Sequence, residues 1–311
     1  MSHETPPLSG PSDSTRSTYS ILSSKASAAG TRVRDALVFS SAYLACIAVV
    51  QVVIAMAVLS LSWNFAPVVV GLVTFAVYAG DRVADAETDA VSNPRQAAFA
   101  RRHGDVLYVL VALAYGLAVA LSVFGGPVAL AVTVLPGAFW VVYAADVLPD
   151  IGARVQRLKD VFLLNTAVVA LAWATTLTFL PLAFAGASVT PSALVVFAYF
   201  FLGTFVSTEI PNVRDTEGDR EIGVSTLPVV VGVTRTRQAL YGVTLAAGGL
   251  VVAAIVVDLL PAVAATLLIG LGYLLAVTAL VGRREVTNAV TIAAECQYLV
   301  AGAVLTIVAL G

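Results

Sequence analysis

The sequence predicts an all-α fold, namely a polytopic membrane helical bundle of nine transmembrane helices with a cytoplasmic N-terminus. Three observations support this prediction: an apolar composition, a series of long apolar segments, and basic residues confined to alternate connections. Of the 311 residues, 59% are hydrophobic and only 12% are charged, whereas soluble proteins carry about 25% charged residues. The composition therefore favours a membrane protein before any motif is considered.

Residues 1–33 form a polar segment, rich in Ser, Thr and Pro, that precedes the first apolar run. A segment of this kind buries too little apolar surface to fold, and it lacks the compact apolar core of a secretory signal peptide. We therefore expect a disordered polar N-terminal tail over residues 1–33 and one transmembrane domain over residues 34–311. The first membrane helix would then act as its own insertion signal.

Nine apolar segments follow the polar tail. A helix needs about 20 apolar residues to cross the hydrocarbon core of a bilayer. The long apolar runs lack the period-2 alternation of membrane β-strands, and an open sheet would leave its edge amides unsatisfied in lipid. The predicted spans cover residues 36–61, 65–80, 105–123, 126–146, 160–184, 191–208, 237–257, 260–281 and 287–310.

Lys and Arg occur before the first predicted span and after the second, fourth, sixth and eighth. The connections after spans one, three, five and seven contain none. Because basic residues accumulate on the cytoplasmic side of membrane proteins, the N-terminus and the even-numbered connections are predicted to be cytoplasmic. The pattern indicates a multi-pass protein of the cell membrane. It also supports nine spans, because a miscounted span would scatter the basic residues over both sides.

Two acidic clusters lie on this predicted cytoplasmic side. Asp81, Asp85 and Asp89 follow the second span at intervals of four residues, and Asp215 and Asp219 follow the sixth span at the same interval. On a helix this interval places the carboxylates on one face. Like charges on one face repel one another, so a cation is expected to compensate them.

Paired carboxylates indicate a magnesium site. Mg²⁺ prefers one or two carboxylates together with phosphate oxygens, and it stabilises the charge that develops on a leaving diphosphate. The neighbouring basic side chains can donate hydrogen bonds to phosphate, and a prenyl tail would lie between the apolar helices. The alternative is a solvated cytoplasmic face. The shared spacing, side and position of the two clusters favour a site.

At these residues the chain resembles the UbiA superfamily of intramembrane prenyltransferases. That family carries Asn-x-x-x-Asp-x-x-x-Asp after its second helix, where Asp81 occupies the place of the Asn, and Asp-x-x-x-Asp after its sixth. Residues 215–232, with their Asp-x-x-Gly-Asp and Thr-Leu-Pro elements, are similar to the second loop of the family. Residues 157–173, which begin with Arg157 and Lys159, are similar to the segment with which the family enters its fifth helix, where basic residues also come first. The resemblance covers roughly residues 34–311.

The resemblance implies Mg²⁺-dependent transfer of a polyprenyl group from its diphosphate to an apolar acceptor, such as a quinone precursor, a lipid or a carotenoid. The implied partners are polyprenyl diphosphate, the hydrophobic acceptor and the lipid bilayer. The implied catalytic metal ligands are Asp81, Asp85, Asp215 and Asp219, with Asp89 as a further metal ligand. The expected diphosphate contacts are Lys159, Arg157 and Asn165. Asn165 can instead hydrogen-bond a neighbouring helix. Arg82, Arg214 and Arg220 are added as diphosphate contacts on the basis of their charge alone.

Glu295 lies inside the last predicted span. An acidic side chain in mid-membrane costs about 2.5–3.5 kcal/mol for Asp on insertion scales and is a functional candidate. It could orient an acceptor or pair with a loop arginine, or it could be a protonated group packed between helices. Aromatic rings can stabilise a carbocation, although aromatic residues are also common near membrane interfaces. The candidate aromatic residues are Tyr143, Trp173, Tyr199 and Tyr298.

Other classes of function have little support. The two cysteines, Cys46 and Cys296, lie in apolar runs, and the only histidines are His3 and His103, which disfavours a disulfide framework, zinc chemistry and histidine triads. No nucleotide-binding motif is present, and no nucleic acid partner is expected. Two alternatives stay open: a non-catalytic isoprenoid-binding homologue and a cation-coupled transporter, although transporters more often place charges at mid-membrane.

Overall fold

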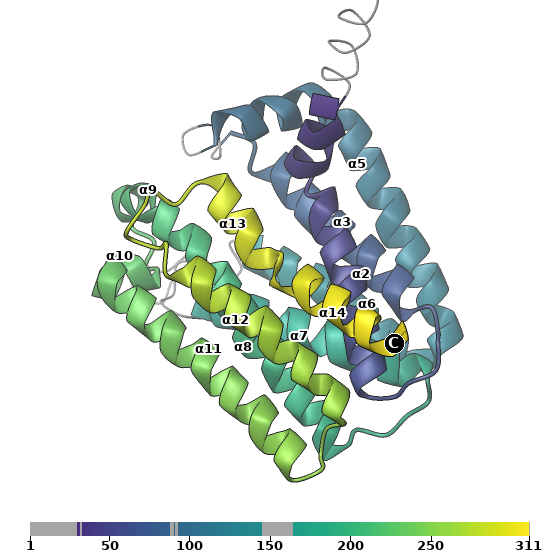
Figure 1. The fold of residues 1–311 in the computed structure, drawn as a ribbon. Coiled ribbons are helices and arrows are strands. Elements are labelled where there is room, and N and C mark those ends of the chain that lie inside the picture. The colour runs from purple at the N-terminus through teal and green to yellow at the C-terminus, as the bar shows by residue number, and fades with distance from the viewer. Residues whose placement is uncertain (1–29, 32, 88–89, 91–92, 145–163, 311) are drawn as a thin grey trace, which may run out of the picture.

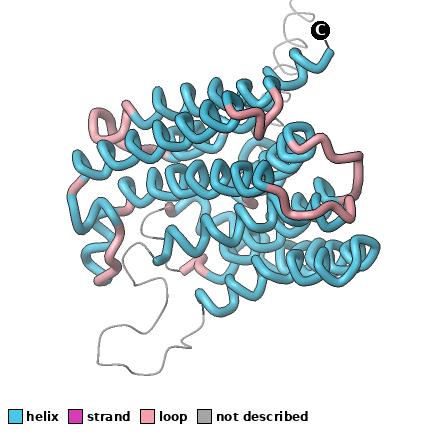
Figure 2. The backbone as a smooth tube through the Cα atoms, turned by 90° about the horizontal axis from the view of Figure 1, so that it is seen from below, coloured by secondary structure: helices cyan, strands magenta, loops and turns pink. Residues whose placement is uncertain are grey.

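The computed structural model describes residues 30–31, 33–87, 90, 93–144 and 164–310, with the backbone alone at 141–144, 164–165 and 222. Most of the predicted tail over residues 1–33 therefore lies outside the described residues, and its boundary with the membrane domain stays a prediction. Throughout the described part the secondary structure is helical, apart from one isolated bridge between Val281 and Arg284. This confirms the predicted all-α class (Figures 1 and 2).

The long helices pack side by side in one bundle (Figure 1). Short helical segments, namely η1 (Val123–Gly125), α9 (Thr216–Ile222), α10 (Leu227–Val231) and η3 (Ala262–Ala265), join them. The long helices and the two halves of the last span are α2 (Ala42–Val58), α3 (Ala66–Ala84), α5 (Pro94–Ser122), α6 (Gly126–Ala144), α7 (Leu164–Phe184), α8 (Pro191–Arg214), α11 (Val233–Val256), α12 (Thr266–Thr278), α13 (Asn288–Glu295) and α14 (Gln297–Leu310).

The starts of several helices follow from local sequence. Proline stands in the first turn of α3, α5, α8 and α10, where its missing amide hydrogen breaks no intrahelical hydrogen bond. At the start of α8 the Ala193 amide donates to the Thr190 hydroxyl at 3.2 Å, which is the usual role of an N-cap threonine.

Among the described residues, six helices are long and apolar enough to cross a membrane. The number becomes seven if the segment Val33–Phe39 and α2, which meet at a bend of 71°, form one span. The protein is therefore a multi-pass membrane protein. The nine spans and the cytoplasmic N-terminus stay predictions, and α12 with its preceding turn is among the shorter apolar helices.

Small residues let the helices approach closely in the core. A Cβ atom on Gly270 of α12 would lie 2.8 Å from the carbonyl oxygen of Gln297 on α14, so these two backbones touch, as small residues allow in membrane bundles. Tyr199, Phe200 and Tyr298 are fully buried and pack edge-on or tilted against one another. Large apolar side chains on the outer faces of α5 and α11 are exposed, as lipid contact requires.

Several helices extend beyond their predicted spans, and the last predicted span contains two helical segments. The spans predicted at 65–80 and 191–208 correspond to α3 and α8, which continue to Ala84 and Arg214. The last predicted span is divided at Cys296 between α13 and α14. Hydropathy detects the apolar part of a helix, whereas the additional turns of α3 and α8 carry polar residues that line a cavity.

Candidate active site

A cavity of about 360 Å³ lies between the helices. Its wall is formed by the start of α2, the last turns of α3 and α8, the beginning of α5, parts of α6 and α7, and one face of α13. Two acids, one from each predicted cluster, line it together: Asp81 and Asp215. Polar and charged side chains thus meet aromatic and apolar ones in one cavity.

Asp81 occupies the last turn of α3 and accepts a hydrogen bond from the indole nitrogen of Trp140 at 3.2 Å. The guanidinium Nε of Arg82 donates to the Ser41 hydroxyl at 3.4 Å. Ser41 stands at the bend before α2 with a φ of 61°, a left-handed conformation that is uncommon for a residue other than glycine. These contacts fix the end of α3 against α2 and α6.

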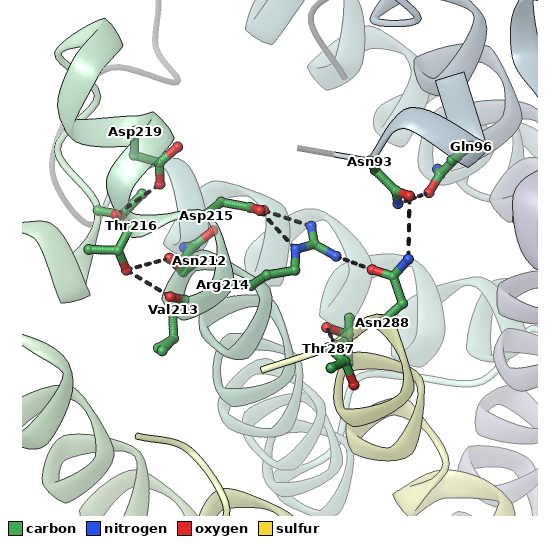
Figure 3. A network of polar contacts seen from close by, with 12 residues as sticks. Asn93, Gln96, Asn212, Val213, Arg214, Asp215, Thr216, Asp219, Thr287 and Asn288 are labelled. Carbon is green, nitrogen blue, oxygen red and sulfur yellow. Dashed lines mark hydrogen bonds and ion pairs between the residues drawn. The ribbon is translucent and has the colours of Figure 1, made fainter. Parts of the chain in front are cut away.

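Asp215 stands at the junction of α8 and α9 and forms a two-point ion pair with Arg214. Nε of Arg214 lies 2.8 Å from Oδ1 of Asp215, and its NH2 atom lies 2.7 Å from Oδ2. The NH1 atom of the same guanidinium donates to the Asn288 side chain of α13. Asn288 donates in turn to Asn93 at 3.4 Å, and Asn93 to Gln96 of α5 (Figure 3). A polar chain therefore joins α8, α13 and α5 across the cavity.

The second acids of the two clusters do not line the cavity. Asp85 caps the C-terminus of α3 and is partly exposed. Asp219 lies one turn beyond Asp215, where its amide donates to the Asp215 carbonyl at 2.8 Å and its carboxylate accepts from Thr226 at 3.1 Å. Burial raises the pKa of Asp219, as does Asp215, while the Thr226 hydrogen bond and Arg214 lower it. Arg220 is exposed on α9.

Other predicted site residues cannot be placed. Asp89, Arg157 and Lys159 lie outside the described residues, and so do the side chains of Tyr143 and Asn165. Their roles stay predictions.

The described residues contain no group of three or more His, Cys, Asp or Glu side chains that could hold a metal ion by itself. Mg²⁺ does not require such a group, because it binds through one or two carboxylates when phosphate oxygens complete its coordination. Asp81 and Asp215, which line one cavity from two different helices, fit this mode of binding. The donor set therefore suits a metal that arrives with a phosphorylated ligand.

Aromatic rings form another part of the cavity wall. Tyr78, one turn before Asp81 on α3, stacks on Trp173 of α7 with ring centroids 5.5 Å apart and planes inclined by 10°. Both residues line the cavity. Of the aromatic residues singled out in the sequence, Trp173 therefore faces the site, whereas Tyr199 and Tyr298 are buried in the core away from it.

Sequence reasoning missed Tyr78, Trp140 and Asn288 as site residues. Trp140 and Asn288 come from segments without an acidic motif, and their place becomes evident only when the helices are packed. One signal was available: Asn288, Thr291 and Glu295 recur at helical intervals and so share one face of α13. All three line the cavity.

A multi-pass membrane bundle with an acid-lined cavity between its helices defines an intramembrane protein with a site for a polar ligand group. The chain belongs to the UbiA prenyltransferase family, whose model matches residues 39–294. Members of this family are prenyltransferases, and this supports the assignment of the chain to the transferases.

Solved structures of low sequence identity share the fold. A UbiA homologue from Aeropyrum pernix K1 is 18% identical, with a TM-score of 0.62, and the match covers 88% of this chain and 98% of that one. A UbiA homologue from Archaeoglobus fulgidus, bound to DMAPP and Mg²⁺, is 14% identical, with a TM-score of 0.59 and coverage of 88% and 99%. A digeranylgeranylglyceryl phosphate synthase is 15% identical, with a TM-score of 0.56 and coverage of 89% and 96%. No curated protein matches the sequence significantly.

Proposed function

We propose that the protein transfers a polyprenyl group from its diphosphate to an apolar acceptor within the membrane, in a reaction that depends on Mg²⁺. The observation that carries this proposal is one cavity that is lined both by two acids, Asp81 and Asp215, and by the stacked pair of Tyr78 and Trp173. Family membership supports the transferase class, and a structure of the same fold binds DMAPP and Mg²⁺.

The diphosphate would lie at the polar end of the cavity, which is the part lined by Asp81, Arg82, Arg214 and Asp215. Asp81 and Asp215 would hold Mg²⁺, which neutralises charge on the leaving diphosphate. Arg82 and Arg214 line the same end and can donate hydrogen bonds to phosphate oxygens. Asp85 and Asp219, one turn beyond the two cavity acids, are proposed as further ligands. Asp89, Arg157, Lys159, Asn165 and Arg220 complete the proposed set.

The reaction begins when the bond between the first prenyl carbon and its oxygen breaks and the electron pair leaves with the diphosphate. Tyr78 and Trp173, which both line the cavity, would stabilise the allylic cation, because aromatic rings attract positive charge. Apolar residues such as Val77 and Val169 line the same space and keep water from the cation. The acceptor nucleophile then attacks the first prenyl carbon.

We also propose nine spans, with the N-terminus and the site on the cytoplasmic side. The continuous apolar stretch Pro94–Trp140 contains α5 and α6, which pack against each other and are joined by the turn η1, so it would cross twice. Counting the bent first span and α12 then gives nine, which matches the alternation of basic residues. Residues 34–311 would form the membrane domain and residues 1–33 a tail.

Incubation of the protein in membranes with labelled prenyl diphosphates, Mg²⁺ and a lipid extract tests the proposal. We expect a prenylated lipid-soluble product whose mass identifies both substrates, and its formation should cease on chelation and in Asp81→Ala and Asp215→Ala. Binding of prenyl diphosphate without product would indicate a non-catalytic homologue. Cation flux across vesicles without either would indicate a transporter.

A further inference from the structure

Glu295 is an acidic side chain within a membrane span, and it lines the same cavity as the two acids of the motifs. It is the last residue of α13, and α14 begins at Gln297, after the single residue Cys296, whose backbone keeps helical angles. It lies near Ser207 of α8, whose hydroxyl donates to the Gly203 carbonyl at 3.0 Å and which lines the same cavity. An ionisable side chain within a membrane span indicates function.

Glu209 shows how a carboxyl that only joins helices is placed in this bundle. It is 1% exposed, does not line the cavity and accepts a hydrogen bond from Thr166 of α7. Glu295 differs, because it stands at the cavity wall and, among the described residues, no lysine or arginine forms an ion pair with it. Its position therefore points to a ligand rather than to helix packing.

The depth of Glu295 separates it from the diphosphate. It follows Asn288, which bonds Arg214 at the polar end, by seven positions on α13. Two turns of helix span about 10 Å. Asp215, directly after α8, likewise follows Thr208 by seven positions, and Thr208 lines the cavity beside Ser207. Glu295 thus lies roughly 10 Å below the diphosphate-binding end, near the stacked pair of Tyr78 and Trp173, within electrostatic range of Tyr78.

We propose that Glu295 binds the acceptor, and that this acceptor is an otherwise apolar molecule that carries a hydroxyl group. The carboxylate accepts a hydrogen bond from that hydroxyl and takes its proton when the prenyl group is transferred. The bond from the first prenyl carbon to the diphosphate oxygen breaks, its electron pair leaves with the diphosphate, and the acceptor oxygen forms the new bond. Where a ring carbon forms it instead, that carbon then loses its proton, which returns to the acceptor oxygen and restores the aromatic ring. This inference rests on the proposed function and names the acceptor class for the same site.

A pair of brominated probes tests the hydroxyl preference in the full-length protein in lipid nanodiscs. The chain has three tryptophans. Trp140 and Trp173 line the cavity, whereas Trp63 is 79% exposed, so Trp63→Phe leaves the two cavity tryptophans as reporters of quenching by bromine. 4-Bromophenol and 4-bromoanisole differ in the hydroxyl that Glu295 would bind. Hydrogen bonds to charged groups predict a Kd lower by roughly tenfold to a hundredfold for the phenol.

The variants decide whether Glu295 causes this preference. In Glu295→Leu the ratio of the two Kd values should fall to about one, whereas in Glu209→Gln, a buried carboxyl outside the cavity, it should stay as in the parent. In Glu295→Gln the amide oxygen still accepts a hydrogen bond but takes no proton, so the preference should persist while incorporation of labelled DMAPP into lipid falls at least tenfold or so.

Equal quenching by both probes in the parent, including none by either, would overturn the inference, as would an unchanged ratio in Glu295→Leu. Unchanged incorporation in Glu295→Gln would overturn the transfer of the proton. Mg²⁺-dependent binding of labelled prenyl diphosphates, from DMAPP to longer chains, is measured in the same nanodiscs and reports on the proposed function separately. If the parent binds none of them, the proposed function fails. If it binds one of them but shows no probe preference, only the acceptor assignment fails.

Discussion

Replacing Arg214 by lysine tests whether the ion pair that holds Asp215 is required for turnover. Arg214 places two nitrogens at 2.8 and 2.7 Å from the two carboxylate oxygens and a third on Asn288. Lysine keeps the charge but lacks the planar fork, so at least one of these hydrogen bonds is lost. A hydrogen bond to a charged group contributes about 1.5–3 kcal/mol, which corresponds to a fall of roughly tenfold to a hundredfold in kcat/KM.

The assay is the initial rate of diphosphate release from DMAPP by the full-length protein in nanodiscs at saturating Mg²⁺. Arg101→Lys is the matched control, because Arg101 is exposed on α5 and does not line the cavity. The loss should appear in Arg214→Lys alone. A wild-type kcat/KM in Arg214→Lys, or an equal loss in the control, would refute the idea that the fork positions Asp215.

Three further predictions concern packing, the aromatic pair and pH. Gly270→Val should lower the thermal unfolding temperature through overpacking of about 1–3 kcal/mol, because its Cβ would meet the Gln297 carbonyl at 2.8 Å, whereas Gly272→Val, with nothing within 4 Å, should not. Tyr78→Leu removes the ring that stacks on Trp173, so we expect the rate of diphosphate release to fall while DMAPP binding, measured by equilibrium dialysis, stays near wild type. Burial raises the pKa of Asp219, so its carboxylate is protonated at a higher pH than an ordinary aspartate. Because Mg²⁺ binds the ionised form, the Mg²⁺ concentration for half-maximal turnover should rise as the pH falls, less steeply in Asp219→Asn; an identical pH profile in both would contradict a role for Asp219.

Hydropathy predicted the helical class well, because a chain in lipid must satisfy every backbone group within helices. It predicted the ends of α3 and α8 poorly. Both helices continue through polar residues to Ala84 and Arg214, since those turns face a cavity rather than lipid. The last predicted span, 287–310, matches the apolar helical stretch Asn288–Leu310.

The spacing of the acids predicted a common site from two distant segments, and the structure places one acid of each cluster, Asp81 and Asp215, at one cavity. Their partners at i+4, Asp85 and Asp219, do not line it, although their amides donate to the carbonyls of Asp81 and Asp215 at 2.8 Å. Asn288 could not be assigned from a motif, since its role depends on the packing of α13 against α8.

The charges at the polar end of the cavity explain why a metal would be needed there. Among the described residues that line this end, two carboxylates, Asp81 and Asp215, stand beside two guanidinium groups, Arg82 and Arg214, so their charges balance before a ligand arrives. A diphosphate adds several negative charges that this balanced set cannot neutralise alone. Asp215 can still accept a cation, because a carboxylate offers about four lone-pair sites and the two hydrogen bonds from Arg214 occupy two of them. The ion pair therefore fixes the orientation of Asp215 and leaves lone pairs that could accept the ion accompanying the diphosphate.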